Sequence, residues 1–307
     1  MTAAQSGPSD GAPTPIPDSF WAALSLTPVR YLGGRLNQHW LVESGGKPFV
    51  LSGYVREPIE SLKYELEVLR RLSQQGWPVP EPVQEPAELL GRLWCLFTLL
   101  PGESRLEQTS DERRARGRLL ALLHEATASL VDIGQRSGFR TANEVVCDPQ
   151  LLQAIRKYER VRPAAGHAMR WHLDKAYEMF DGLRLEDAET IVLHGDFTPW
   201  NTLFEGERLS GIVDFEATHL NYRVSDFALS WRGHQDDVIQ GYEQVRALNE
   251  LDWQLLVPCY WSWLFLGIQE EISAMIEGNA PYHDFAWQVR HLIRRSKISH
   301  AAIYPGA

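Results

Sequence analysis

The segment Ile191-Val-Leu-His-Gly-Asp-Phe-Thr-Pro-Trp-Asn-Thr-Leu-Phe204, followed by Leu209-Ser-Gly-Ile-Val-Asp-Phe-Glu216, carries the most informative pattern in this chain. Its apolar stretches alternate with short polar ones, which predicts a strand, a polar loop and a two-stranded hairpin with a tight turn. Asp196, Asn201 and Asp214 then lie at the ends of buried strands. Because a hairpin returns on itself, we expect Asp214 to come close to Asn201.

These three side chains suit the transfer of a phosphoryl group. Such a reaction needs a carboxylate that orients the attacking hydroxyl and accepts its proton, and oxygen ligands that hold Mg²⁺ against the nucleotide phosphates. Carboxylate and amide oxygens are the ligands that hard cations prefer. The alternative interpretation is a chance group of polar turn residues, although the strand, the motif and the hairpin coincide here.

The segment resembles the catalytic loop of the aminoglycoside phosphotransferase and choline kinase family, relatives of the protein kinases, in which H-G-D-x-x-x-x-N is followed by D-x-[DE]. The resemblance implies that Asp196 is the catalytic base and that Asn201 and Asp214 are the metal ligands. It makes His194 an organiser of the loop rather than a general base. Asp226, in Ser-Asp-Phe-Ala-Leu, matches an aspartate that hydrogen-bonds the catalytic-loop backbone in relatives, the alternative being a plain helix N-cap.

The resemblance also implies an α+β fold, the two-lobed protein-kinase-like fold. We expect a disordered tail over 1–17, a small N-lobe over 18–99 with an antiparallel sheet plus a helix, and a larger, mainly helical C-lobe over 100–307 that holds the catalytic loop and the acceptor site. Hydrophobic periodicity predicts strands at 29–32, 39–43, 49–52 and 93–99, and helices at 59–74, 119–126, 151–160, 168–179 and 253–276. Leu100-Pro101-Gly102 is the expected hinge.

The N-lobe is expected to bind ATP. Gly33 and Gly34 resemble the short glycine-containing nucleotide loop of the family, and the adenine is expected against the backbone of Thr98 to Leu100. On the helix at 59–74, Glu65 falls within the apolar stripe, whereas Glu67 points to the opposite side. Since an isolated buried carboxylate is costly, an inward Glu65 needs a partner.

The chain departs from the family pattern at Ser52. Relatives have a phosphate-binding Lys, or sometimes Arg, after the apolar residues of the third strand, and here that position is serine. The missing charge would come from Arg56 or from Arg35 in the glycine loop. Alternatively the pocket binds ATP less tightly, or prefers another donor nucleotide.

The amino-acid composition limits the classes of partner and the compartment that we expect for this protein. The chain has 307 residues and a formal net charge of -10, which argues against nucleic acid as the main partner. Three scattered cysteines indicate a reducing compartment. The N-terminal segment has no signal-peptide core, and the longest apolar run is too short to span a membrane. We therefore expect a cytoplasmic protein, and the sequence does not indicate its oligomeric state.

The predicted activity is that of an ATP- and Mg²⁺-dependent kinase that acts on a small-molecule hydroxyl. The acceptor is expected to be homoserine-like, an amino alcohol or an aminoglycoside. Acidic residues such as Asp237 would suit a cationic amine acceptor, the alternative being a solvated acidic face. The rival function, which the serine at position 52 makes plausible, is a nucleotide-binding regulatory protein that resembles a catalytically weak pseudokinase.

Overall fold

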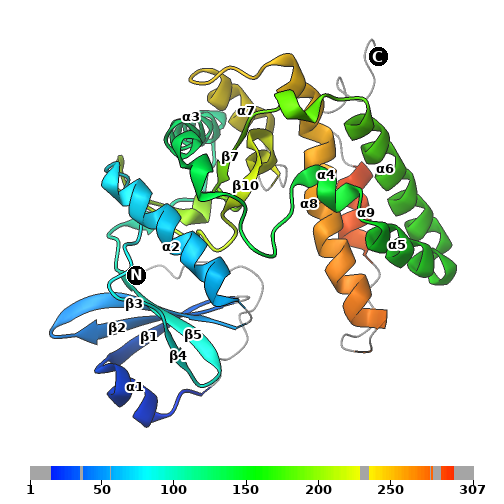
Figure 1. Cartoon of the computed structure of the whole chain (residues 1–307). Helices are drawn as coiled ribbons and strands as arrows, with labels where there is room; N and C mark the ends of the chain where they lie inside the picture. The colour runs from blue at the N-terminus through cyan, green and yellow to red at the C-terminus, as the bar shows by residue number, and fades with distance from the viewer. Residues whose placement is uncertain are drawn as a thin grey trace. The chain divides into compact units, whose positions relative to one another are not determined.

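The computed structural model describes residues 15–34, 37–55, 57–228, 235–276, 278 and 285–293. The chain forms two compact units (Figure 1). The described residues up to Arg105, together with Asn201–Asp214, make up the first unit, and the described residues of Leu106–Trp200 and from Phe215 onward make up the second. Most of the predicted tail lies outside the described residues, and the predicted lobe boundaries stay a prediction.

The first unit contains a five-stranded antiparallel sheet with the strand order β1-β2-β3-β5-β4. The strands are β1 (Thr27–Gly33), β2 (Gln38–Ser44), β3 (Lys47–Tyr54), β4 (Ala87–Leu89) and β5 (Arg92–Thr98). The predicted turn between β2 and β3 is present, with Gly45 and Gly46 at positive φ. The four predicted strands are confirmed, and the three-residue β4 adds an unpredicted edge.

The two faces of this sheet are covered by different helices (Figure 1). One face packs against α1 (Asp18–Leu24), whose Phe20 and Trp21 join a core with Val42, Leu51, Trp94 and Leu96. Because side chains alternate along a strand, Ser52 and Tyr54 lie on the opposite face, toward α2 (Ile59–Gln74). The helix α2 has the predicted bounds, and Glu65 is buried in its apolar stripe as expected.

The predicted hairpin consists of β8 (Thr202–Glu205) and β9 (Arg208–Ile212) and belongs to the first unit. Its strand β8 also pairs with β6 (Glu103–Ser104), directly after the expected hinge. Ser210 Oγ donates to the carbonyl of Pro101 over 2.7 Å, and a side chain at Gly102 would collide with that hydroxyl. The hinge segment is therefore bound to the hairpin, a contact that the sequence did not predict.

The second unit is mainly helical, with a two-stranded antiparallel sheet of β7 (Thr190–Leu193) and β10 (His219–Tyr222). Its helices are α3 (Ser110–Thr127), α4 (Ala142–Val146), α5 (Pro149–Val161), α6 (Pro163–Asp181), α7 (Gln235–Glu243), α8 (Glu250–Ile276) and α9 (Ala286–Ile293), and short 3-10 turns include η4 (Arg223–Phe227). The four helices predicted in this region are confirmed. The repeating apolar residues of α8, Val257, Trp261, Leu264, Ile268 and Ile272, are buried.

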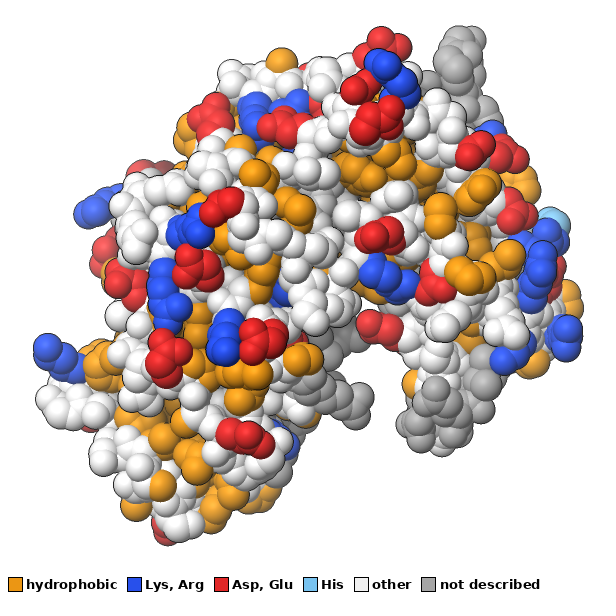
Figure 2. Space-filling view, in the orientation of Figure 1, with side chains coloured by type: hydrophobic (Ala, Val, Ile, Leu, Met, Phe, Trp, Pro, Cys, Tyr) orange, Lys and Arg blue, Asp and Glu red, His pale blue; other side chains and the backbone are white. Residues whose placement is uncertain are grey.

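None of the described helices combines the length and apolarity that crossing a bilayer would require. The three cysteines are free, and Cys95 and Cys259 are buried. On the face shown in Figure 2, side chains of Lys and Arg are interspersed with those of Asp and Glu. Partly exposed ion pairs such as that of Arg71 and Glu67, 2.8 Å apart on α2, contribute little to stability.

Candidate active site

A buried aspartate binds the backbone of the loop that contains Asp196. In the second unit, Asp226 on η4 accepts a hydrogen bond from the backbone N–H of His194 (2.9 Å) and another from that of Gly195 (2.7 Å). These are the contacts that the resemblance implies, and the N-cap of η4 is Tyr222 instead. The carboxylate of Asp226 thus fixes the two residues that precede Asp196.

His194 acts on the same loop. Its Nδ1 accepts the backbone N–H of Asp196 over 3.2 Å, and its ring packs 4.4 Å from the ring of Phe215. The side chain is buried, which suits a loop organiser rather than a general base. Gly195, which lies between His194 and Asp196 in sequence, adopts φ +84°. A Cβ there would lie 2.3 Å from the carbonyl oxygen of Ala217, so only glycine fits.

His124 completes the support of Asp226. Its Nε2 lies 3.0 Å from Asp226 Oδ2, and its Nδ1 lies 3.0 Å from the hydroxyl of Tyr242. Burial lowers the pKa of His124, although the hydrogen bond to Asp226 opposes this shift. Burial raises the pKa of Asp226, but its hydrogen bonds and the nearby histidines outweigh burial and lower it. Burial thus disfavours the charged imidazole of His124, whereas its hydrogen bond favours the ionised carboxylate of Asp226.

Two arginines also hold the segments around the motif, and sequence reasoning missed both. Arg116 Nη1 donates to the carbonyl of Phe197 (3.0 Å), directly after Asp196, while its guanidinium forms two hydrogen bonds to Glu107. Arg136 Nη1 donates to the carbonyl of Glu216 (2.9 Å), two residues after Asp214 in sequence. Arg116 falls at helical spacing with buried Leu120 and Leu123, the same signal that identified Glu65.

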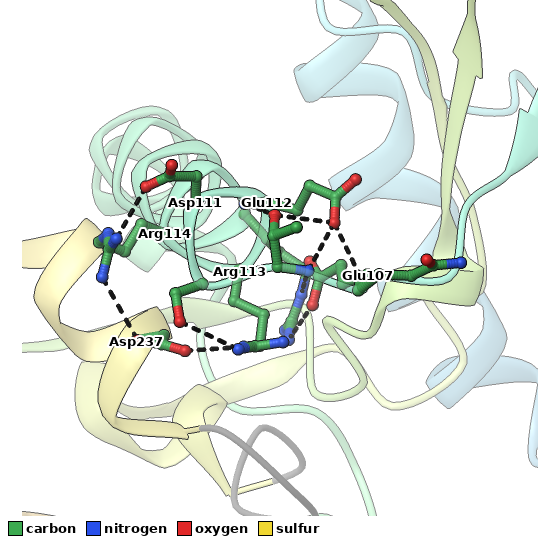
Figure 3. A network of polar contacts seen from close by, with 10 residues as sticks. Glu107, Asp111, Glu112, Arg113, Arg114 and Asp237 are labelled. Atoms are coloured by element: carbon green, nitrogen blue, oxygen red, sulfur yellow. Dashed lines mark hydrogen bonds and ion pairs between the residues drawn. The ribbon is translucent and has the colours of Figure 1, made fainter.

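The ion pair of Glu107 belongs to a larger polar network at the start of α3 (Figure 3). In this network Arg113 Nε donates to Asp237 Oδ2 over 2.7 Å, and Arg114 pairs with Asp111 and Asp237. Burial raises the pKa of Asp237, but the hydrogen bonds from Arg113 and Ser110 and the charges of Arg113 and Arg114 together outweigh burial and lower the pKa. Asp237 therefore joins α7 to α3 and is not part of a solvated acidic face.

In the first unit the structure brings the two candidate metal ligands together. Asn201 Nδ2 lies 3.5 Å from Asp214 Oδ2, and the backbone N–H of Val213 donates to the carbonyl of Asn201 (2.9 Å). Asn201 is buried, and Asp214 has φ +69°, a conformation that is costly for a residue other than glycine. Outliers of this kind gather at functional sites.

The donor set at Asn201 and Asp214 fits Mg²⁺. Within the described part of the chain there is no group of three or more His, Cys, Asp or Glu that could hold a metal ion. Mg²⁺ does not require such a cage, because it is commonly held by one or two protein oxygens together with substrate phosphates. A carboxylate beside an amide is a set of that kind.

Among the described residues, one partner of Glu65 is a tyrosine. Glu65 Oε1 accepts a hydrogen bond of 2.8 Å from the hydroxyl of Tyr54, at the end of β3. Ser52, two residues earlier on the same face, is buried and lies 2.9 Å from His39 Nδ1 through its Oγ. Tyr54 therefore supplies a neutral donor near the place where the resemblance implies a cation.

The remaining predicted nucleotide contacts lie on the same unit. Gly33, the last residue of β1, and the following Gly34 have φ +105° and +131°, whereas Arg35 and Arg56 lie outside the described residues. In the expected hinge, the backbone N–H of Thr98 donates to the carbonyl of Glu81 over 2.9 Å. Leu100 packs close to Gly211 of β9, where an added Cβ would lie 3.0 Å from its Cδ1.

Relatives of this chain are kinases by name. The homoserine kinase of Zymomonas mobilis is 25% identical over 232 residues, which cover 70% of each chain. The homoserine kinase of Beijerinckia indica is 28% identical over 234 residues, covering 69% of this chain and 70% of that one.

Solved structures of aminoglycoside phosphotransferases share the fold. Spectinomycin phosphotransferase APH(9)-Ia, crystallised with ADP and spectinomycin, has a TM-score of 0.64 at 14% identity and covers 94% of this chain and 98% of its own. Aminoglycoside phosphotransferase APH(4)-Ia has a TM-score of 0.64 at 16% identity with the same coverage. These similarities confirm the predicted α+β kinase-like fold.

A family model extends the similarity along the chain. The model described as the phosphotransferase enzyme family matches residues 27–256, well over half of the sequence. The matched span includes the glycine loop, α2, the catalytic-loop segment and η4. This chain therefore belongs to the phosphotransferase enzyme family.

Proposed function

We propose that this phosphotransferase moves the γ-phosphoryl group of ATP to a hydroxyl of a small molecule, with a homoserine-like hydroxy amino acid as the first acceptor to test. The observation that carries the proposal is the contact between Asn201 and Asp214 in the first unit. It brings together the two oxygen-bearing side chains that a nucleotide-bound cation would need.

In this proposal Asp196 orients the acceptor hydroxyl and accepts its proton. The hydrogen bonds of Asp226 and His194 to the loop backbone restrict the conformations that Asp196 can adopt. Such restraint matters because phosphoryl transfer depends mainly on positioning and on charge stabilisation. Asn201 and Asp214 would hold Mg²⁺, which neutralises charge on the transferring phosphates when bound.

The choice of donor and acceptor rests on the relatives. Structural neighbours were crystallised with ADP or AMP-PNP, which supports ATP as the donor here. Those neighbours also carry spectinomycin or hygromycin B, whereas the sequence relatives are homoserine kinases. Since sequence identity to the homoserine kinases is higher, a homoserine-like acceptor stands before an amino alcohol or an aminoglycoside among the proposed acceptors.

The test is release of ADP from Mg-ATP in the presence of homoserine, choline, amino sugars, aminoglycosides and sugar alcohols. We expect release with one acceptor class, loss of it in Asp196→Ala, and unchanged binding of ADP by that variant. Full transfer activity in Asp196→Ala would refute the role of this residue. An Asp214→Ala variant should lose the Mg²⁺ dependence of nucleotide binding.

A second candidate function is nucleotide binding without turnover, followed by regulation of a partner. The observation in its favour is Ser52, whose hydroxyl faces a histidine where relatives have a cation. Nucleotide binding that raises the melting temperature, with no ADP release from any acceptor, would favour this candidate over the kinase.

A further inference from the structure

The helices α3 and α7 of the second unit pack directly against each other (Figure 1). A Cβ built on Gly117 of α3 would lie 2.0 Å from the carbonyl oxygen of Val238 and 2.8 Å from the backbone nitrogen of Tyr242, both on α7. A Cβ on Gly241 would lie 2.0 Å from the carbonyl oxygen of Arg114. The two backbones are therefore in contact, and no side chain fits between them at this crossing.

The close crossing brings a tyrosine of α7 to a histidine of α3. His124 lies seven residues after Gly117 and so on the same face of α3. The hydroxyl of Tyr242 is 3.0 Å from His124 Nδ1, and both side chains are fully buried. The ring of Tyr242 also packs edge to face against Phe227, with ring centres 5.0 Å apart. Since Phe227 directly follows Asp226, Tyr242 contacts both the histidine that binds Asp226 and the residue next to Asp226.

A buried ion pair packs against the same tyrosine. Arg223 Cζ lies 6.0 Å from the ring centre of Tyr242. Arg223 Nε donates to Asp252 Oδ1 over 3.1 Å, and its Nη2 donates to the carbonyl of Ala247 over 2.9 Å. This fixed guanidinium restricts the positions open to the tyrosine ring, so the hydroxyl stays directed at His124.

The two ring nitrogens of His124 have different roles. Its Nε2 lies 3.0 Å from Asp226 Oδ2, and an ionised carboxylate can only accept, so Nε2 carries the proton of this hydrogen bond. Burial disfavours the charged imidazole, and in the neutral ring Nδ1 is then an acceptor for the hydroxyl of Tyr242. Burial also raises the pKa of Tyr242, although Arg223 and Arg246 oppose this shift, so the hydroxyl keeps the proton that it donates.

These hydrogen bonds form a continuous path to the loop before Asp196. Tyr242 donates to His124, which donates to Asp226. Asp226 in turn accepts the two backbone N–H groups that precede Asp196. Because Asp226 Oδ2 accepts from both the imidazole and the backbone, a shift of the imidazole would move the carboxylate relative to the loop. Hydrogen bonds in a buried network depend on one another, so removal of the outermost one alters those nearer the loop.

We propose that Tyr242 is a positioning residue for phosphoryl transfer, which acts through His124 and Asp226 on the backbone that carries Asp196. The inference rests on the proposed function, because it assumes that Asp196 orients the acceptor hydroxyl. It extends the support of the loop from η4 to α7, a helix that the sequence did not connect with the motif.

The test compares phosphoryl transfer by wild type and by Tyr242→Phe, with the acceptor that the ADP-release assay identifies. Phenylalanine keeps the packed ring and removes one neutral hydrogen bond, so we expect kcat to fall roughly three- to tenfold. The KM for ATP and the affinity for ADP should stay unchanged, because the predicted nucleotide contacts lie in the first unit.

Tyr222→Phe is the matched control. Tyr222 is also a buried tyrosine of the second unit, and its hydroxyl donates to Asn143 Oδ1 over 2.9 Å. This variant should lose a similar amount of thermal stability, since it also loses one buried hydrogen bond. Its kcat should equal that of wild type, because the bond does not lead to the loop.

A double-mutant cycle separates positioning from a general loss of stability. If Tyr242 acts through Asp226, Tyr242→Phe should lower kcat in the wild-type background and have no further effect in Asp226→Asn. Tyr242→Met serves as a second variant if phenylalanine prevents folding, because the flexible methionine can fill the space without a hydroxyl. The melting temperature checks folding in each case.

Histidine-selective ¹⁵N labelling gives a direct readout of the first hydrogen bond in the path. The resonances of His124 are assigned by their absence in His124→Asn. In Tyr242→Phe the Nδ1 resonance should move toward the position of an imidazole nitrogen that accepts no hydrogen bond, and in Tyr222→Phe it should stay in place.

The outcomes are distinguishable. A wild-type kcat in folded Tyr242→Phe, or an unmoved Nδ1 resonance, would overturn the inference and leave the kinase proposal in place. Multiplicative losses of kcat in the double variant would overturn it too, because the tyrosine would then act by another route. An equal loss of kcat in Tyr222→Phe would also overturn it, since any lost buried bond would then suffice. Wild-type protein that transfers phosphate to no acceptor would refute the proposed function, and the inference would fall with it.

Discussion

Asp226→Asn is the substitution that tests most directly how the loop before Asp196 is held. The carboxylate of Asp226 is fully buried and accepts hydrogen bonds from the backbone of His194 and Gly195 and from His124. Asparagine keeps the shape but has only one acceptor oxygen. In either orientation its amide N–H₂ faces a backbone N–H, so a donor meets a donor.

The magnitude follows from those contacts. A hydrogen bond to a charged group contributes about 1.5–3 kcal/mol, and a buried donor left without an acceptor costs about 1–3 kcal/mol. Since removal of a buried charge offsets part of this, we expect the free energy of unfolding to fall by about 2–4 kcal/mol. A domain with a stability of roughly 5–15 kcal/mol remains folded after such a loss.

Two measurements check this prediction. Urea unfolding at neutral pH should show a lower midpoint with an unchanged m-value. In the acceptor assay kcat should fall on the order of a hundredfold, since small displacements of a catalytic group have effects of that size. The KM for ATP should change little, because Asp226 lies in the second unit, whereas the predicted nucleotide contacts lie in the first.

The control is Thr127→Val, a buried polar change on α3. Thr127 Oγ1 is buried and has no hydrogen-bond partner among the described residues, so valine should cost less than about 0.5 kcal/mol. If the free energy of unfolding of Asp226→Asn lies within about 1 kcal/mol of the wild-type value and kcat is unchanged, Asp226 does not hold the loop before Asp196.

Three further predictions follow from single contacts. Gly195→Ala should cost more than about 2 kcal/mol and remove activity, whereas Gly206→Ala, at φ +60° with no atom within 4 Å, should cost only about 1 kcal/mol; equal melting temperatures for the two variants would contradict this. Burial lowers the pKa of His124, so as the pH falls the unfolded state binds this proton before the folded state does, and stability that is present above about pH 6.5 is lost. In urea titrations between about pH 8 and 5, the free energy of unfolding should therefore depend less steeply on pH in His124→Asn than in wild type. An unchanged pH dependence would exclude this histidine as the cause. Tyr54→Phe removes one hydrogen bond to buried Glu65 and should lower the free energy of unfolding by about 1–3 kcal/mol in the same assay. An unchanged free energy of unfolding would refute this prediction.

Local patterns in the sequence predicted much of the fold. The stripe of leucines on α2 gave the bounds of the helix and the inward side of Glu65, because burial follows helical spacing directly. The hairpin at 202–212 followed from two apolar arms around a turn. In contrast, α1 has only seven residues and β10 only four, and such short elements show too few periods to be recognised.

Contacts between residues far apart in the sequence were harder to predict than the helix or strand on which each residue lies. That Glu65 needed a partner could be deduced from its burial, but the sequence did not indicate that Tyr54 would be one such partner. The contacts of Arg116 and Arg136 join residues about eighty positions apart in sequence. No local pattern encodes such pairs, since they arise only when the second unit folds. The roles of Asp196, Asn201 and Asp214 stay predictions that the variants above test.

The division of the chain has a consequence for recombination between relatives. The chain passes from one unit to the other after Arg105, after Trp200 and again after Asp214, so no single crossover point separates the two units. A chimaera that exchanges residues only up to Arg105 would combine a foreign β6 and Pro101 with the native β8 and Ser210. It would also mismatch the bond between the N–H of Ile212 and the carbonyl of Pro78. Exchanges that preserve the first unit must therefore carry the fourteen-residue segment Asn201–Asp214 with it, together with both candidate metal ligands.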